Sequence, residues 1–521
     1  MARVIGDDRD NLLAGGARVP LNPHREWGRP LALPGLPTAL LPLALLVLLA
    51  APQAAASQPS PARPSIVLIL TDDEDLAAHA HLPKTKALLE EQGTSFANYF
   101  ATYSLCAPSR VTLLRGQYAH NHNVEGNRPP TGGYGKFEAL GHGTSTVATW
   151  LREAGYHTAL VGKYVNGYEA DQHPPAPGWD HWFVTQNRFY DYQANRNGAV
   201  VAFGHAAKDY LTDVLAAEAV GVIRRAAAAG QPFFLHVTPF APHGPATPAP
   251  RHARSDSEVA LPRPPSLDEA DVGDKPEPVR ACPPITPERE RALEARHRKR
   301  VRALQAVDDL VERLVRALAE TGRLASTYVI YAADNGFHMG EHRIGLQKTT
   351  PYEEAIRVPL VVRGPGVPVG RRVERMVVNN DLAPTLAAIA GVAPPSYVDG
   401  RSFLPLLTDP DRPWRQVFLI ERRETEARAS EAPVLTGAAV FDALRTDGGL
   451  TYVEYGNGER ELYDLRRDPF QLDNRAASAD PALLAALSTR LAALRACAAA
   501  TCRELEDRPI EPAPPAAVTA R

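Results

Sequence analysis

One stretch of the sequence reads Ser65-Ile66-Val67-Leu68-Ile69-Leu70-Thr71-Asp72-Asp73, and it already indicates the class of fold. A short, continuous apolar run that ends in polar residues is typical of a strand buried on both faces of a parallel sheet. The pattern returns at Thr327-Tyr328-Val329-Ile330-Tyr331-Ala332-Ala333, which Asp334-Asn335-Gly336 follows. We therefore predict two buried strands that both end in oxygen-bearing side chains.

Helical and strand patterns alternate between and after these two runs. We expect helices at 144–154, 211–229, 288–324 and 381–390, a turn and strand at 155–163, and strands at 232–238 and 358–362. This alternation predicts an α/β fold with a mostly parallel central sheet flanked by helices. Beyond Trp414 the pattern changes to short strands at 417–421, 438–444, 450–455 and 461–465, followed by a helix at 481–496. These elements predict a smaller C-terminal domain with an antiparallel sheet and a helix.

The composition is that of an ordinary globular protein. The chain has 521 residues, 44% hydrophobic and 22% charged, which is ample for a sizeable core. Lys and Arg number 57 against 60 Asp and Glu, so the formal net charge is -3. This balance favours neither nucleic acid nor an acidic membrane surface as a partner. We therefore expect specific sites to carry the function.

The N-terminus has the pattern of a secretory signal peptide. Arg25 and Arg29 precede an apolar run at 39–49, and Ala54-Ala55-Ala56 resembles a cleavage site. A membrane anchor is the alternative, but the run falls short of the roughly 20 residues that a spanning helix needs, and Pro42 interrupts it. We expect a secreted or extracytoplasmic protein with no stable membrane anchor. The expected organisation is a leader at 1–56, a proline-rich spacer at 57–64, a large domain at 65–412, a C-terminal domain at 413–507 and a disordered tail at 508–521.

The chain has four cysteines, and two of them lie close together near the C-terminus. Cys497 and Cys502 could close a local disulfide in an exported protein. A zinc pair is the weaker alternative, because no His or further Cys lies beside them in the sequence. Cys282 lies in a proline-rich loop without an obvious partner.

The fourth cysteine opens the segment Cys106-Ala107-Pro108-Ser109-Arg110, which precedes a short helical pattern closed by Gly116. Cys106 is therefore predicted at or near a helix N-terminus, where free backbone N–H groups and the helix dipole favour an anion. Arg110, one helical turn later, would point back at the same place. The segment indicates a site for an oxyanion. An ordinary cysteine nucleophile is the alternative, although no histidine can be paired with it from the sequence alone.

The strand ends supply further candidate side chains. Four hard oxygen donors suit calcium or magnesium and fit zinc poorly, and these are Asp72, Asp73, Asp334 and Asn335. The alternative is that each pair forms a plain turn. Lys163 also falls at the end of a strand, and Lys348 follows Asp334 in the chain. His243 lies in a loop whose flanking prolines fix its position, which makes it a catalytic candidate.

With this motif in view, the chain resembles the type I sulfatases, whose motif is Cys-x-Pro-Ser-Arg followed by a short apolar segment and glycine. The resemblance extends from about Pro64 to Cys502. It includes the segment from Gly155-Tyr156 to Gly162-Lys163 and the C-terminal Glu461-Leu462-Tyr463-Asp464-Leu465 with Asp468-Pro469. The run Gly162-Lys163-Tyr164-Val165-Asn166-Gly167-Tyr168 looks most like the N-acetylglucosamine-6-sulfatase and extracellular endosulfatase branch.

The resemblance implies an alkaline-phosphatase-like large domain and a set of roles for the candidate residues. Cys106 would be oxidised to formylglycine (3-oxoalanine) by a formylglycine-generating or sulfatase-maturating enzyme. One calcium ion would be held by Asp72, Asp73, Asp334 and Asn335, and would also contact residue 106. Arg110 would orient the formylglycine diol, Lys163 and Lys348 would bind sulfate oxygens, and His243 would lie near the leaving oxygen.

The activity implied by the resemblance is hydrolysis of sulfate monoesters. A hydroxyl of the hydrated aldehyde would attack sulfur and form a covalent sulfate intermediate, and the second hydroxyl would expel sulfate. The expected substrate is a sulfated carbohydrate such as 6-O-sulfated N-acetylglucosamine in a glycosaminoglycan-like chain, or an aryl sulfate. One departure is Val165, because arylsulfatases commonly have a histidine there; Asn166 is a possible replacement.

Three alternatives to this activity remain. The chain could be an arylsulfatase of broad specificity. It could also be a phosphodiesterase or phosphonate monoester hydrolase of the alkaline-phosphatase superfamily, although the sequence shows no ligands for the second metal that such sites usually have. In a non-catalytic carbohydrate-binding relative, Cys106 would remain a thiol.

Overall fold

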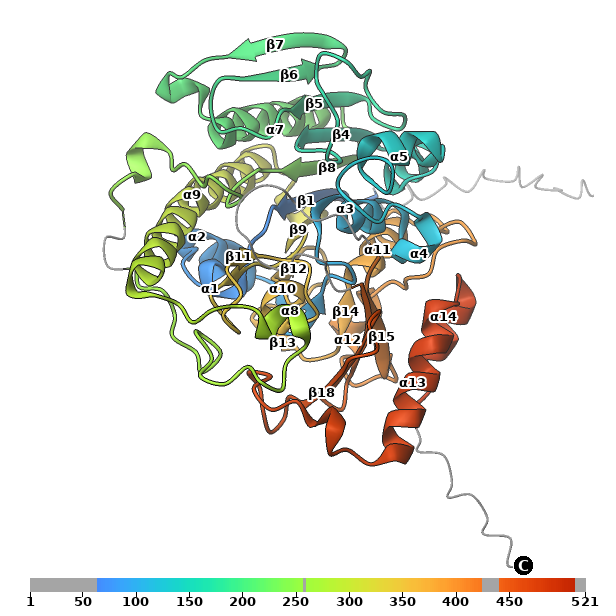
Figure 1. Ribbon diagram of the computed structural model, residues 1–521. Coiled ribbons are helices and arrows are strands. Elements are labelled where there is room, and N and C mark those ends of the chain that lie inside the picture. Colours follow the sequence, from blue (N-terminus) through green and yellow to red (C-terminus); the bar gives the residue numbers. More distant parts are fainter. Residues whose placement is uncertain (1–62, 256–258, 424–439, 511–521) are drawn as a thin grey trace, which may run out of the picture. The chain divides into compact units, whose positions relative to one another are not determined.

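The fold is described from a computed structural model, which covers residues 63–255, 259–423 and 440–510 (Figure 1). The chain divides into two compact units, and all described residues belong to the second, Pro61–Arg521. The predicted leader, most of the spacer and the tail beyond residue 510 lie outside the described residues. Within the described ranges, no helix combines the length and the apolar character that a membrane-spanning segment needs.

A ten-stranded sheet forms the centre of the large domain (Figure 1). β1, β8, β9, β4 and β5 pair in parallel, whereas β12, β6 and β7 pair antiparallel. In spatial order the strands are β13 (Arg371–Val373), β2 (Thr94–Phe96), β12 (Leu360–Arg363), β9 (Thr327–Ala333), β1 (Ser65–Thr71), β8 (Phe233–Thr238), β4 (His157–Gly162), β5 (His181–Thr185), β6 (Tyr192–Arg196) and β7 (Ala199–Phe203). The predicted mostly parallel central sheet is confirmed.

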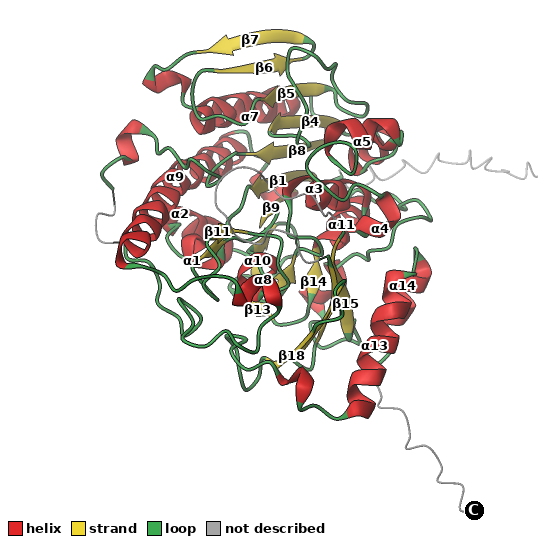
Figure 2. Ribbon diagram, in the orientation of Figure 1, coloured by secondary structure: helices red, strands yellow, loops and turns green. Residues whose placement is uncertain are grey.

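Helices cover both faces of this sheet (Figure 2). Because side chains of a strand alternate between faces, Ile66 and Leu68 of β1 pack into one core and Val67 into the other. The first core contains residues of α3 (Cys106–Arg115), α6 (Val147–Glu153) and α11 (Leu382–Ile389). The second contains residues of α7 (Leu211–Ala228) and α9 (Pro287–Glu320). This two-sided burial explains why β1 and β9 are continuous apolar runs in the sequence.

A separate four-stranded antiparallel sheet forms the C-terminal part of the described chain. Its strands are β15 (Val417–Arg422), β16 (Phe441–Thr446), β17 (Leu450–Tyr455) and β18 (Arg460–Asp464). One face packs on α13 (Pro481–Arg495), through residues such as Leu419 and Leu491. The other face packs against Phe100 and Ile356 of the large domain. The predicted antiparallel sheet and its helix are confirmed, while the domain boundary at 412/413 stays a prediction.

Shorter elements connect these layers. They are α1 (Leu76–His79), α2 (Pro83–Thr85), β3 (Tyr99–Phe100), α4 (Ala119–His122), α5 (Gly133–Ala139), α8 (Glu277–Arg280), β10 (His338–Met339), β11 (Leu346–Gln347), α10 (Glu353–Ile356), β14 (Val377–Val378), α12 (Leu404–Thr408) and α14 (Ala500–Asp507).

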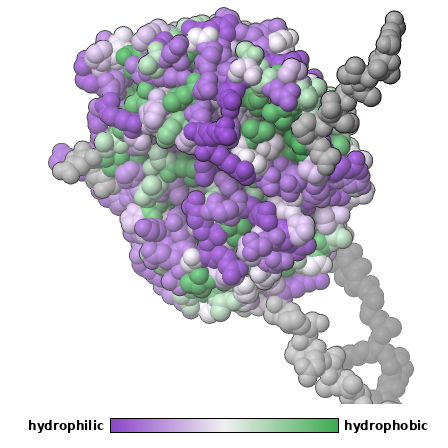
Figure 3. All heavy atoms as spheres, turned by 90° about the horizontal axis from the view of Figure 1, so that it is seen from below, coloured by the Kyte–Doolittle hydropathy of each residue, from purple (hydrophilic) through white to green (hydrophobic). Residues whose placement is uncertain are grey.

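Most apolar side chains of the described ranges are buried. On the face that Figure 3 shows, hydrophilic residues predominate and hydrophobic residues form separate patches between them. The large hydrophobic side chains that are exposed in the described chain are Leu76, Leu140, Val200, Val369 and Phe470.

Candidate active site

The candidate site lies at the carboxyl ends of three adjacent strands. β9, β1 and β8 are neighbours in the large sheet, so the loops that follow them meet at one edge. Asp72 and Asp73 follow β1, Asp334 and Asn335 follow β9, and His243 lies in the loop after β8. Two backbone contacts align these loops: the Asp334 N–H donates to the Thr71 carbonyl at 3.1 Å, and Asp72 forms an isolated bridge with Pro242.

Cys106 is the first residue of α3, as the sequence predicts. Its side chain is fully buried, and its Sγ lies 3.4 Å from Asp72 Oδ1 and 3.9 Å from Asp73 Oδ1. A residue far along the sequence caps the N-terminus of α3, because Asn127 Oδ1 accepts the Ala107 N–H at 2.9 Å. Gly116 closes the helix in the left-handed conformation, with φ 69°.

Three buried cations surround the carboxylates. Lys163 Nζ donates to Asp72 Oδ2, and Lys348 Nζ donates to Asp73 Oδ1. Lys348 Nζ also lies 2.7 Å from Cys106 Sγ. Arg110 Nε donates to Asp334 Oδ2 at 2.9 Å, which places the guanidinium beside the same group of acids.

His243 approaches this cluster from the loop after β8. Its Nδ1 lies 2.9 Å from the Gly244 carbonyl oxygen, and because a carbonyl can only accept, Nδ1 carries a proton. Its Nε2 faces the site and lies 3.6 Å from Asp73 Oδ2. Burial lowers the pKa of His243 below its ordinary value. The imidazole is therefore oriented for proton exchange at Nε2.

The oxygen donors of the site, from Asp72, Asp73 and Asn335, fit a hard divalent cation, whereas Cys106 Sγ and His243 Nε2 are softer donors. Asp72, Asp73, Cys106 and His243 each offer a ligand atom, and these atoms lie within 4.8 Å of one another. Asn335 donates its amide N–H to Asp73 Oδ1 at 2.8 Å, while its Oδ1 is buried without a hydrogen-bond partner among the described residues. A carbonyl-type oxygen left without a donor beside carboxylates suits a cation such as calcium or magnesium.

The charges at the site shift each other's ionisation. Burial by itself opposes ionisation of Asp72, but Lys163 and neighbouring cations hold its pKa well below the ordinary value. Burial and the Asp72 carboxylate raise the pKa of Asp334 to about 6. Burial and Asp72 also raise the pKa of the Cys106 thiol to about 11. The side chain of Cys106 is thus held as a thiol, whereas a cysteine nucleophile needs a lowered pKa.

The structure brings together the residues predicted to bind the metal or to take part in catalysis, which are Asp72, Asp73, Cys106, Arg110, Lys163, His243, Asp334, Asn335 and Lys348. One further residue, Asn127, contacts the start of α3 by accepting the Ala107 N–H. Asn166 Oδ1 is buried and has no hydrogen-bond partner in the described chain, and the preceding residue, Val165, is buried as well. Asn127 was not predicted, because a loop asparagine 21 positions after Cys106 has no signal in the sequence.

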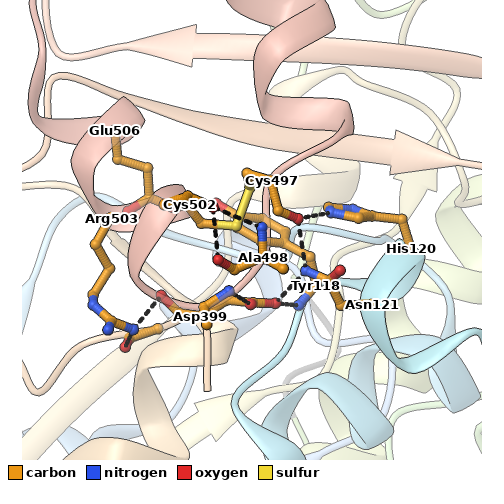
Figure 4. Close-up of a disulfide and its surroundings, with 12 residues drawn as sticks. Tyr118, His120, Asn121, Asp399, Cys497, Ala498, Cys502, Arg503 and Glu506 are labelled. Carbon is orange, nitrogen blue, oxygen red and sulfur yellow. Dashed lines mark hydrogen bonds between the residues drawn. A yellow bond between two sulfur atoms is a disulfide. The ribbon is translucent and has the colours of Figure 1, made fainter. Parts of the chain in front are cut away.

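The predicted disulfide between Cys497 and Cys502 is confirmed (Figure 4). The Cys497 carbonyl accepts from Asn121 Nδ2 at 3.0 Å and lies 2.9 Å from His120 Nε2, so the bridge is tied to the α4 region. Cys282 is a buried free thiol whose Sγ lies 3.4 Å from the Pro278 carbonyl oxygen.

Comparison with known proteins gives one consistent family. The family model described as "Sulfatase" matches residues 64–392, and one described as "N-sulphoglucosamine sulphohydrolase, C-terminal" matches residues 340–497. Human N-acetylglucosamine-6-sulfatase is 34% identical over 521 residues, covering 93% of this chain and 94% of the relative. An extracellular sulfatase SULF-1 homolog of Drosophila melanogaster is 38% identical over 71% of this chain, but the match spans only 34% of that relative. An arylsulfatase of Chlamydomonas reinhardtii is 34% identical, covering 84% of this chain and 75% of the relative.

Solved structures show the same fold. A protein in complex with its substrate D-glucosamine-2-N,6-O-disulfate superposes with a TM-score of 0.70 at 23% identity, covering 82% of this chain and 97% of that one. A phosphonate monoester hydrolase from Silicibacter pomeroyi has a TM-score of 0.64 at 24% identity, with 82% and 93% covered. The chain therefore belongs to the sulfatase family, as a type I sulfatase close to the N-acetylglucosamine-6-sulfatase and extracellular endosulfatase branch.

Proposed function

We propose that this sulfatase releases sulfate from a 6-O-sulfated glucosamine residue, with residue 106 as formylglycine and a bound calcium ion. The observation that carries the proposal is the position of Cys106. Its Sγ is buried at the start of α3, 3.4 Å from Asp72 Oδ1 and 2.7 Å from Lys348 Nζ. A side chain at this point meets the oxygen donors, the lysines and the helix N-terminus at once.

Calcium would be held by Asp72, Asp73, Asp334 and Asn335, together with residue 106. When bound, the cation would stabilise negative charge on the sulfate and on the attacking oxygen. Asp72 is well suited to this role because its low pKa keeps it ionised. Formylglycine, when formed and hydrated, would supply two hydroxyls on one carbon, so that one can attack sulfur and the other can drive the release of sulfate and restore the aldehyde.

The remaining residues of the site would bind and orient the sulfate ester. Lys163 and Lys348 donate to the carboxylates of Asp72 and Asp73, so their ammonium groups are at the site and would donate to the oxygens of a bound sulfate. Arg110 has a buried Nη2 without a hydrogen-bond partner among the described residues, so it can donate to residue 106. His243 Nε2 faces the site, and in the imidazolium form it would donate a proton to the leaving alcohol oxygen.

Sulfated glucosamine is proposed as the substrate from the relatives. The human relative that matches nearly end to end is an N-acetylglucosamine-6-sulfatase, and one protein of the same fold binds D-glucosamine-2-N,6-O-disulfate. Val165 also supports this branch, because arylsulfatases commonly have histidine at that position. A broad arylsulfatase is the second candidate, since the algal arylsulfatase is equally similar in sequence.

We further propose that the protein is secreted through the leader at 1–56 and matured by a formylglycine-generating or sulfatase-maturating enzyme. The disulfide between Cys497 and Cys502 supports an oxidising compartment. The SULF-1 homolog among its relatives is described as extracellular.

A substrate panel tests this proposal. Protein produced with a maturation enzyme would be incubated with glucosamine 6-sulfate, N-acetylglucosamine 6-sulfate, glucosamine N-sulfate, an aryl sulfate and a phosphonate monoester. We expect sulfate release to be fastest from the 6-O-sulfated sugars. Fastest turnover of the aryl sulfate would favour the second candidate, and turnover of the phosphonate alone would contradict the proposed function.

A further inference from the structure

We infer that Arg300, on the long helix α9, is the positioning residue that holds together the three loops carrying the proposed metal ligands. The inference rests on the proposed function, because it concerns the affinity of that site for its cation. Arg300 touches none of the proposed ligand side chains. It contacts backbone carbonyls of the loops that carry these ligands and side chains of other residues in the same loops.

The guanidinium of Arg300 reaches a loop after each of the three strands. Its Nη2 donates to the Asp73 carbonyl and, at 2.7 Å, to Asp75 Oδ2, both in the loop after β1. Its Nη1 lies 3.5 Å from the carbonyl oxygen of Pro242, the residue before His243. Its Cζ lies 4.7 Å from the ring centroid of Phe337, two residues after Asn335. One planar group therefore joins the loops after β1, β8 and β9.

The contact with Asp73 stabilises an unfavourable backbone conformation. Asp73 has φ 66°, a left-handed conformation that costs a non-glycine residue free energy. That conformation must be held by surrounding contacts, because Asp73 must point its carboxylate at the site. The Asp73 N–H donates to Asp334 Oδ1 at 3.1 Å, and its carbonyl accepts from Arg300. Arg300 thus holds the carbonyl of Asp73 in place and so helps to orient the Asp73 carboxylate, a proposed metal ligand.

Burial makes this arrangement hard to replace by another residue. Arg300 is 1% exposed and Asp75 is 7% exposed, so their ion pair is largely shielded from water. Only arginine offers a rigid fork of several donors in one plane and a flat face for an aromatic ring. Lysine would keep the charge, but its single ammonium could not reach all three loops in the same geometry.

The test compares three variants on the same helix by calorimetric titration with calcium chloride. Arg300→Met removes the contacts, and Arg300→Lys keeps the charge. The matched control is Arg302→Met, because Arg302 is half-buried two residues away and donates at 2.8 Å to the carbonyl of Ser255, which lies farther along the connection after β8, beyond the short helix Pro250–His252. Thermal melts without calcium would record the stability of each variant.

We expect Arg300→Met to weaken calcium binding by about 10- to 100-fold, the usual effect of losing a group that orients metal ligands. The calcium affinity of Arg300→Lys should lie between those of Arg300→Met and wild type, and Arg302→Met should bind calcium as tightly as wild type. Unchanged calcium affinity in Arg300→Met would overturn the inference. If Arg300→Met does not fold, Arg300→Lys decides: weakened calcium binding supports the inference, and wild-type affinity overturns it.

The outcomes separate this inference from the proposed function. A wild-type protein that binds calcium and releases sulfate, together with an Arg300→Met variant of unchanged affinity, would refute only the role of Arg300. A wild-type protein that binds calcium but releases no sulfate from any member of the panel would refute the proposed function. In that case, a loss of calcium affinity in Arg300→Met would still support the positioning role.

Discussion

Two clusters of buried charges in this protein are built on opposite principles. The site cluster consists of Asp72, Asp73, Asp334, Lys163, Lys348 and Arg110. The Arg415 cluster consists of Arg415, Asp381, Glu506, Arg401 and Tyr118, and it lies under the C-terminal helix α14. Both clusters have fully buried members, yet their hydrogen bonding differs.

In the Arg415 cluster the central groups, Arg415, Asp381 and Glu506, satisfy one another, and within this cluster Arg401 Nε lacks a hydrogen-bond partner among the described residues. Arg415 donates from Nη1 and Nη2 to the two Asp381 oxygens and from Nε to Glu506 Oε2 at 3.2 Å. Glu506 Oε1 accepts from Tyr118, and its Oε2 also accepts from Arg401 at 3.0 Å. In the site cluster, by contrast, Arg110 Nη2 has no hydrogen-bond partner among the described residues, and the same holds for Oδ1 of the neighbouring residue Asn335, which follows Asp334.

The difference teaches how to separate a structural from a functional charge cluster. When the central groups of a buried cluster satisfy one another, they have no bonding capacity left for a ligand, so the cluster acts on the stability and specificity of the fold. A cluster with unused donors and acceptors holds them for groups that bind later. This contrast predicts that substitutions in the two regions will change different measured quantities.

The largest expected effect is that of Cys106→Ala. The substitution removes the proposed nucleophile, and we expect the rate of sulfate release to fall by at least about 10⁴-fold, as for other residues that carry the chemical step. The melting temperature should change little, because alanine fits the start of α3. Sulfate release would be measured with N-acetylglucosamine 6-sulfate. Turnover close to that of wild type would show that the nucleophile lies elsewhere.

Arg415→Met should instead lower the free energy of unfolding. Removing the cation leaves Asp381 and Glu506 buried without their main partner, which costs about 3–5 kcal/mol of the free energy of unfolding. Urea titration would measure this loss. At a temperature where the variant remains folded, kcat should equal that of wild type. A lower kcat with unchanged stability would contradict the structural role of this cluster.

Chelation should act on the site cluster alone. Because a ligand that binds only the folded state stabilises it by RT ln(1 + [L]/Kd), calcium at about 100 times its Kd should add about 2.7 kcal/mol. We expect a chelator to abolish sulfate release and lower the melting temperature, and added calcium to restore both. Arg415→Met should show the same calcium-dependent shift. The absence of any shift in the wild-type protein would count against a cation at the site.

The smallest expected effect belongs to the disulfide. A bridge that closes so short a loop, from Cys497 to Cys502, removes little entropy from the unfolded chain, and its loss should cost about 2 kcal/mol. The double variant Cys497→Ser/Cys502→Ser should therefore melt earlier while keeping its kcat. Cys282→Ser is the control, because it removes a free thiol and leaves the disulfide intact. Its melting temperature should therefore still fall when a reductant is added. An equal loss of kcat in the double variant would mean that the bridge affects the site.

The core and most of the site could be predicted from sequence because their signals are local. β1 and β9 are buried on both faces, so each appears as an apolar run, and their ligands follow directly at Asp72 and Asp334. The strands β5, β6 and β7 were not predicted. β7 lies at the sheet edge, where Ala199–Phe203 is largely exposed and lacks a regular pattern. Nor could the sequence show that β12 runs antiparallel to β9.

Residues that act across long sequence distances were also missed. Arg300 reads as one more arginine in a charged amphipathic helix, and only the fold brings it to Asp73, 227 positions away. Arg415 meets Asp381 and Glu506 at separations of 34 and 91 residues. No spacing rule connects such partners, because tertiary packing alone decides which side chains meet.

The most direct test of the account is the chemical state of residue 106. Mass spectrometry of the tryptic peptide 87–110, from protein made with a maturation enzyme and shown to release sulfate, should find the aldehyde of formylglycine in place of the Cys106 thiol. The peptide should then resist alkylation by iodoacetamide. A fully active preparation in which residue 106 is an unmodified, alkylatable thiol would contradict the central claim.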